Sequence, residues 1–206
     1  MSGYALTSAS HDDGSRAATS PYRDAGYVLL VALSYYAGTR VGFALTGRDM
    51  PISTFWPPNA IVLAALVLAP VNLWWKILLG LVPVHFLAQL PGGVPVPTAL
   101  GWLVGNVSEA VLGAALLVGP ARRKTLFHSL NGVTRFLLCG FILAPVVTSF
   151  IDAAIVVETN WGRNYWVLWT TRGLSNMLAE LTIVPLIVVA GSRRARGSPG
   201  RRRGWR

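Results

Sequence analysis

The chain has 206 residues, of which 53% are hydrophobic and only 13% are charged. A soluble domain normally carries about 25% charged residues, so most of this chain is expected to face lipid or a protein interior. The length suits one domain and leaves no room for a second, soluble module. The composition therefore predicts an all-α integral membrane protein and excludes an ordinary soluble enzyme.

The formal net charge of +10 is concentrated at the C-terminus. Seven of the 18 basic residues lie in the last fourteen positions: Arg193, Arg194, Arg196, Arg201, Arg202, Arg203 and Arg206. This segment directly follows an apolar span and has no aromatic residues spaced to stack on bases. We therefore expect no nucleic-acid partner. We expect instead a cytoplasmic tail on anionic headgroups, worth about 1 kcal/mol per basic residue near the surface.

Six apolar runs are separated by segments rich in Gly, Pro and Asn, which are typical of turns. About 20 residues are needed to cross the hydrocarbon core, and the runs are too continuous for barrel strands. The expected helices span 24–46, 57–69, 73–90, 98–118, 130–157 and 165–190. The sequence thus predicts a bundle of about six transmembrane helices over 24–190. We expect a disordered tail at 1–23 and a basic cytoplasmic tail at 191–206.

Basic residues also predict the orientation of this bundle, because they favour the cytoplasmic side. With the N-terminus inside, the cytoplasmic segments before the tail hold seven basic residues: Arg16, Arg23, Lys76, Arg122, Arg123, Lys124 and Arg135. The outer loops hold only Arg48 and Arg163. Both termini are therefore expected to be cytoplasmic. Aromatic residues expected at the outer interface are Trp56, Trp161, Tyr165 and Trp166.

The run from Ser53 to Asn59 joins the first two expected helices. Pro57 and Pro58 lack N–H donors and suit the first turn of a helix, whereas Trp56 precedes proline and favours extended backbone. The helix that follows is only about 20 Å long and too short for the bilayer core. Two interpretations remain open. One is a plain helix start with an interfacial tryptophan. The other is an extended segment that dips into the membrane against protein or a wet cavity.

Small residues on the fourth helix recur every four positions at Gly101, Gly105 and Gly113, with Glu109 on the same face. Such spacing lets helix backbones approach closely. A carboxylate at mid-membrane should face protein rather than lipid. We therefore predict that Glu109 is buried and bonded to a polar group. The expected partners are Arg172, Arg40 and Asn176.

The last helix carries a second polar stripe of the same spacing, formed by Arg172, Asn176 and Glu180. We expect Arg172 to reach Asp152 or Glu109, and Glu180 to reach Arg135. Such groups are functional candidates by default, but a buried network that fixes helix register also explains them. Both explanations remain open.

No catalytic or metal site is expected. The sequence has no phosphate-binding loop, serine elbow or H-E-x-x-H motif. His85 is interpreted as a hydrogen-bonded core residue, and no metal-ligand spacing connects it with His11 or His128. The sequence predicts no cofactor and no metal.

Three runs resemble the MASE1 family of membrane-associated sensor domains: STFWPPNAIVLAA at 53–65, NLWWKILLG at 72–80 and GNVSEA at 105–110. The resemblance implies a multi-pass input domain of the bacterial inner (plasma) membrane, of the kind that precedes a kinase or cyclase. Together with the polar stripes it suggests one ligand-binding or polar core. Its candidate residues are Trp56, Pro57, Pro58, Asn59, Asn106, Glu109, Arg172, Asn176 and Glu180.

The leading hypothesis is a membrane-embedded sensory input domain without catalytic activity or an output module of its own. An alternative is a small transporter, or a transporter subunit, that uses the buried polar residues. A further alternative is a non-catalytic membrane partner that assembles through the glycine face. The expected partners are the lipid bilayer and another membrane protein or a downstream signalling module.

Overall fold

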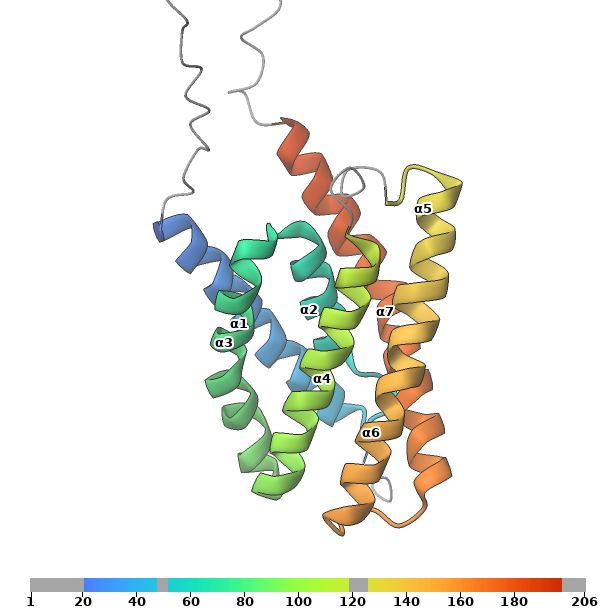
Figure 1. Ribbon diagram of the computed structural model, residues 1–206. Helices are drawn as coiled ribbons and strands as arrows, with labels where there is room; N and C mark the ends of the chain where they lie inside the picture. The colour runs from blue at the N-terminus through green and yellow to red at the C-terminus, as the bar shows by residue number, and fades with distance from the viewer. Residues whose placement is uncertain (1–20, 48–51, 119–125, 198–206) are drawn as a thin grey trace, which may run out of the picture.

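The computed structural model describes residues 21–47, 52–118 and 126–197, and all regular structure within these ranges is helical (Figure 1). Residues 1–20 of the expected disordered tail lie outside the described residues, and so do Arg201, Arg202, Arg203 and Arg206 of the basic tail. Residues 21–23, however, already belong to the first helix. The helices are α1 Pro21–Ala44, α2 Pro57–Leu68, α3 Val71–Gln89, η1 Leu90–Gly92, α4 Val96–Leu117, α5 Leu130–Arg135, η2 Phe136–Leu143, α6 Ala144–Glu158 and α7 Tyr165–Gly197.

The first five expected helices match these elements to within about three residues at each end. The sixth was expected to end at position 190, but α7 continues to Gly197. At 33 residues it is about 50 Å long, more than the bilayer core requires. The start of α1 and the end of α7 lie at the same end of the bundle in Figure 1.

Four helical stretches are long and apolar enough to cross a membrane: Val71–Gly92, Val96–Leu117, Leu130–Glu158 and Tyr165–Arg193. The large side chains on their outer surfaces are apolar and exposed, as with Leu79 at 63% and Leu186 at 70%. Such a surface suits contact with lipid tails. The chain is therefore an all-helical, multi-pass membrane protein.

The short helix α2 forms the centre of the bundle. Ten of its twelve residues are buried, and it packs against α1, α4 and α7. A helix that is apolar on every side is expected in such a surrounded position. Two aromatic donors satisfy carbonyl groups in its last turn: the Trp74 indole on Leu66 at 2.9 Å and the Tyr27 hydroxyl on Ala65 at 3.0 Å. These bonds matter because lipid offers no substitute for water at a helix end.

The glycine face of α4 packs against α6, as the four-residue spacing predicts. A Cβ atom at Gly101 would overlap Ile155, and one at Gly105 would overlap the Asp152 carboxylate. At Gly113 a Cβ would lie 3.7 Å from that of Ala144. The α4 backbone therefore lies directly against side chains of the antiparallel helix α6 over about three turns.

The helix before α6 contains a wide turn that the sequence analysis missed. Residues Phe136–Leu143 form a π-helix, in which the Ala144 N–H bonds to the carbonyl of Cys139. Pro145 follows immediately and has no N–H to donate to the previous turn. Because a π-turn changes the angular register of a helix, it helps to set which face of α6 is buried.

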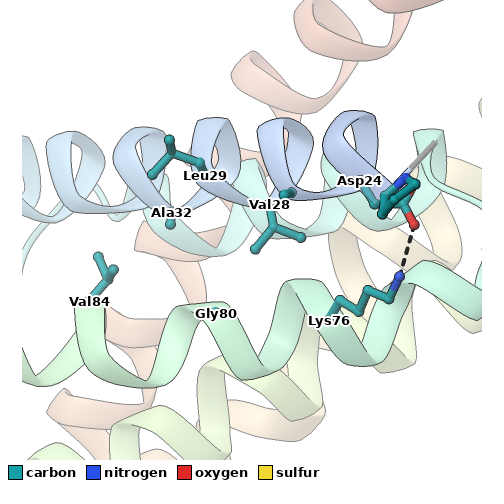
Figure 2. Close-up of a pocket in the computed structure, with 9 residues that line it drawn as sticks. Asp24, Val28, Leu29, Ala32, Lys76, Gly80 and Val84 are labelled. Carbon is teal, nitrogen blue, oxygen red and sulfur yellow. Dashed lines mark hydrogen bonds and ion pairs between the residues drawn. The ribbon is translucent and has the colours of Figure 1, made fainter.

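A groove of about 510 Å³ lies between α1 and α3, lined mainly by apolar side chains such as Val28, Leu29 and Val84 (Figure 2). At its end Lys76 Nζ lies 2.9 Å from Asp24 Oδ2. The ion pair is on the bundle surface, where the lysine side chain is 40% exposed. It therefore joins α1 to α3 without entering the interior.

Candidate functional site

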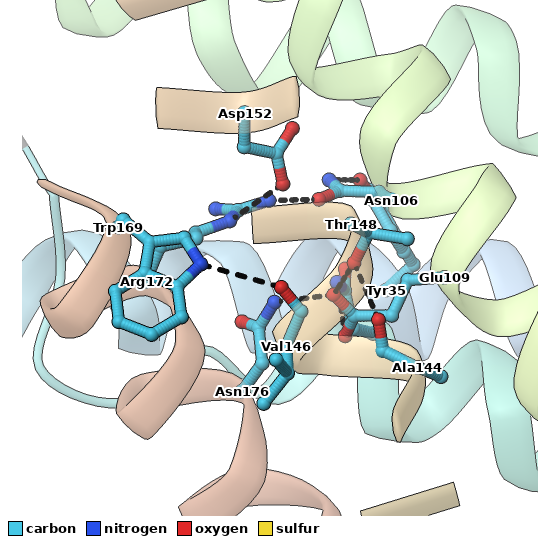
Figure 3. Close-up of polar contacts among 11 residues, drawn as sticks. Tyr35, Asn106, Glu109, Ala144, Val146, Thr148, Asp152, Trp169, Arg172 and Asn176 are labelled. Carbon is cyan, nitrogen blue, oxygen red and sulfur yellow. Dashed lines mark hydrogen bonds and ion pairs between the residues drawn. The ribbon is translucent and has the colours of Figure 1, made fainter. Parts of the chain in front are cut away.

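Four charged side chains lie inside the described part of the bundle, with at most 2% exposure: Glu109, Asp152, Arg172 and Glu180. They come from α4, α6 and α7 and gather where these helices meet (Figure 3 shows the first three). We group them with their neutral partners into two clusters. The arginine cluster comprises Arg172, Asp152, Asn106 and Trp56. The glutamate cluster comprises Glu109, Asn59, Thr148, Asn176 and Glu180.

Arg172 holds the arginine cluster together. Its Nε lies 3.0 Å from Asp152 Oδ2, and an NH₂ group donates to Asn106 Oδ1. The guanidinium also lies over the Trp56 ring, 5.7 Å from the ring centroid. Of the two acidic partners expected for Arg172, the structure selects Asp152. The buried cation is thus balanced by one carboxylate and contacts helices α4 and α6 and the segment before α2.

Trp56 is buried, with 4% exposure, so its ring faces protein rather than lipid. Its ring lies on the backbone of α1 at Gly42, where a Cβ would come within 2.6 Å of the ring, and meets Phe43 edge-on. The backbone of Trp56 is non-helical, and the preceding Ile52 and Ser53 are also buried. This geometry agrees with an irregular segment shielded by protein, the second of the two interpretations of this run.

A chain of hydrogen bonds leads from the arginine cluster to α3. Asn106 Nδ2 donates to the Tyr35 hydroxyl at 3.1 Å, and that hydroxyl lies 2.8 Å from His85 Nδ1. His85 Nε2 lies 2.8 Å from the carbonyl of Ala99. A carbonyl only accepts, so Nε2 carries hydrogen and Nδ1 of a neutral ring accepts from Tyr35. His85 is therefore a fully bonded core residue, as expected. Nothing in the sequence distinguishes Tyr35 from the other tyrosines.

Glu109 receives three hydrogen bonds in the glutamate cluster. Asn59 donates to Oε1 at 2.8 Å, while Asn176 and Thr148 donate to Oε2 at 2.7 Å each. Of the three expected partners, Asn176 is confirmed. Arg172 binds elsewhere and Arg40 is exposed on α1, so neither neutralises this carboxylate. Neutral donors from three other helices converge on Glu109.

Glu180 was expected to pair with Arg135, and this was wrong. Both its carboxylate oxygens are buried without a hydrogen-bond partner. Helices α6 and α7 are antiparallel: Asp152 binds Arg172, and four residues along each helix Thr148 and Asn176 bind the same Glu109 oxygen. A further four residues along each helix place Glu180 level with Ala144. Arg135 lies nine residues further on, about 13 Å along the helix axis.

Two of the three sequence runs noted above, 53–65 and 105–110, meet in this interior. Pro57 and Pro58 form the first turn of α2 and bring Asn59 to Glu109. In the GNVSEA run, Gly105 lets α6 pack closely against α4. Asn106 belongs to the arginine cluster and Glu109 to the glutamate cluster. No group of three or more His, Cys, Asp or Glu side chains suited to a metal occurs among the described residues. The fold and interior thus define a helical membrane protein with a closed polar core.

A comparison with protein-family models matches residues 27–206 to MASE1. The chain therefore belongs to the MASE1 family of membrane-associated sensor domains, which confirms the resemblance. Searches of curated proteins and of solved structures found no significant match.

Proposed function

We propose that this chain is a sensory input domain of the bacterial inner membrane, without catalytic activity of its own, in which the two polar clusters hold α7 in a defined state. The observation that carries the proposal is the family match together with the three side chains, Arg172, Asn176 and Glu180, that α7 alone contributes to these clusters. A stimulus that changes either cluster would change the position of α7.

The packing supports α7 as the output element. It contacts α2, α6 and η2, so it responds to the core from several sides. It also extends to Gly197, beyond the length needed to cross the bilayer core. A rigid helix of this kind carries a displacement to whatever is joined to its cytoplasmic end.

We further propose six membrane crossings, counting α1 and the short α2, with both termini in the cytoplasm. The excess of basic residues on the proposed cytoplasmic side supports this orientation. The arginine-rich segment from Arg193 to Arg206 then lies beside anionic headgroups. The domain so defined comprises residues 24–190, with its α7 helix continuing into the basic tail.

A fusion experiment tests the sensory proposal. The full chain is joined through α7 to a diguanylate cyclase module, and cyclase activity is measured in membranes for the wild type, Arg172→Gln and the surface variant Glu158→Gln. We expect Arg172→Gln to change cyclase output strongly and Glu158→Gln to leave it unchanged. If Arg172→Gln folds and leaves output unchanged, the polar core does not control α7.

Transport is the competing function, and the close packing of the core argues against it. A cavity of about 10 Å³ lies beside Arg172 and Trp56, which is room for about one water molecule. We expect purified chain in liposomes to carry no proton or sodium flux above that of empty vesicles. A flux that Arg172→Gln abolishes would favour the transporter.

A further inference from the structure

Glu180 is the one buried charged side chain of the described residues for which the structure shows no hydrogen-bonded or ionic partner. It is fully buried, and both its carboxylate oxygens lack a donor. The other three each have a partner: Asp152 binds Arg172 through one of its two oxygens, and Glu109 accepts three hydrogen bonds. An ionised group left in this state inside a membrane is very unfavourable.

The position of Glu180 brings it against a second carboxylate. It lies one helical turn from Asn176, which bonds to Glu109, and residues four apart share a helix face. Glu180 lies close enough to Glu109 for the two carboxylates to interact electrostatically, although no donor joins them. Two ionised carboxylates offer each other only acceptors and repel, whereas a carboxylic acid has one O–H to donate. A single proton therefore satisfies both groups.

No other charge on the surrounding helices can take the place of that proton. On α7 itself, Arg172 is two turns away and is bound by Asp152 of α6 and Asn106 of α4. Helix α2 has no titratable side chain, and η2 contributes only the half-buried Cys139. Tyr35 of α1 is engaged by Asn106 and His85.

We propose that the glutamate cluster is a proton-binding site, in which Glu180 is a carboxylic acid that donates its hydrogen to the Glu109 carboxylate. The two asparagine amides and the Thr148 hydroxyl mark Glu109 as the ionised member, because all three can donate to it. Orphaned acceptors at Asn59 Oδ1 and Asn176 Oδ1 belong to the same cluster. They offer the proton on Glu180 further acceptors if the cluster rearranges.

The proton joins two helices that have few backbone contacts of their own. With the proton bound, Glu180 of α7 is hydrogen-bonded to Glu109 of α4. When the proton leaves for water, two adjacent carboxylates repel and drive α7 away from α4. The proposed sensory function left the stimulus open, and a proton-binding site would make that stimulus the proton concentration. It is measured on the purified chain, so the result does not depend on any signalling output.

Infrared spectroscopy of the full chain in lipid nanodiscs tests the proposal. A protonated carboxylic acid has a carbonyl stretching band, separate from the amide bands, that shifts in D₂O. We expect this band at neutral pH in the wild type and in Glu158→Gln, which changes an exposed carboxylate on α6. We expect it to be absent in Glu180→Gln, and to be present but shifted in Glu109→Gln, which alters the acceptor.

Absence of the band from the wild type would overturn the proposal, as would its loss in Glu109→Gln or Asp152→Asn with retention in Glu180→Gln. If the wild type has no band and sodium chloride stabilises it against heat where choline chloride does not, the cluster binds a metal cation instead. Should Glu180→Gln fail to fold, Glu180→Asp provides the same assignment. This variant keeps an acid of different length, so the band should shift, and an unshifted band would place the proton elsewhere.

Discussion

A methyl group added at Gly105 should destabilise the bundle far more than one added at a looser helix contact. At this position of α4 a Cβ would overlap the Asp152 carboxylate, which is held by Arg172. Gly173 of α7 is the matched control, because it is also a buried helical glycine and faces α6. A Cβ there would lie 3.6 Å from Ser149 Oγ, which is ordinary van der Waals contact.

The magnitude follows from opposing effects. Alanine is favoured over glycine by about 1 kcal/mol inside a helix. At Gly105 this gain is opposed by about 1–3 kcal/mol if the helices separate, or by about 3–5 kcal/mol if Asp152 moves off Arg172 and the buried ion pair breaks. If the ion pair breaks, we expect Gly105→Ala to lower the free energy of unfolding by about 2–4 kcal/mol net. Gly173→Ala should be neutral or slightly stabilising.

Unfolding of the purified chain in detergent, followed by circular dichroism, measures both changes. A second comparison uses leucine: Gly105→Leu should be much less stable than Val104→Leu, because Val104 is 53% exposed on the lipid-facing side. Equal stability of Gly105→Ala and Gly173→Ala, or of the two leucine variants, would refute the proposed contact between α4 and α6.

Three further predictions concern other parts of the molecule. Glu109→Gln should lower stability by about 1.5–3 kcal/mol, because it replaces a carboxylate that accepts charge-assisted hydrogen bonds. Thermal unfolding compared with the exposed Glu158→Gln control checks this, and equal melting temperatures of the two variants would contradict it. Tyr35→Phe should cost about 1–3 kcal/mol, since it leaves His85 Nδ1 and the Asn106 amide without their shared partner, whereas Tyr36→Phe, at a position 37% exposed, should change little. Reporter fusions after Gly92 and Gly162 should both give the periplasmic signal, and a cytoplasmic signal at either site would overturn the proposed topology.

Much of the fold could be predicted because lipid imposes simple rules on sequence. Apolar runs and the turn residues between them gave helix bounds close to those observed. The spacing of Gly101, Gly105 and Gly113 identified the face of α4 that meets another helix. These features depend on local periodicity and composition, which the sequence displays directly.

Partner choice in the polar core was predictable only in part. The positions of residues along their helices were sufficient to suggest Asp152 as a partner of Arg172 and Asn176 as a partner of Glu109. They failed for Glu180, because Arg135 lies about two and a half turns too far along the antiparallel helix. The burial of Trp56 was not predictable either, because it depends on the absence of a side chain at Gly42 on another helix. Contacts that depend on which faces meet require the three-dimensional packing.

The polar stripe of α7 limits the motions that a sensor of this structure could use. If α7 slid by one turn toward its N-terminal end, Asn176 would replace Arg172 opposite Asp152, and both charged groups would lose their partner. Breaking a buried pair costs about 3–5 kcal/mol, so sliding is opposed at the arginine cluster. The glutamate cluster resists less, because its Glu180 link depends on one exchangeable proton. Under the proposed mechanism α7 therefore tilts about Arg172, with its greater displacement at Glu180 and at the cytoplasmic end beyond it.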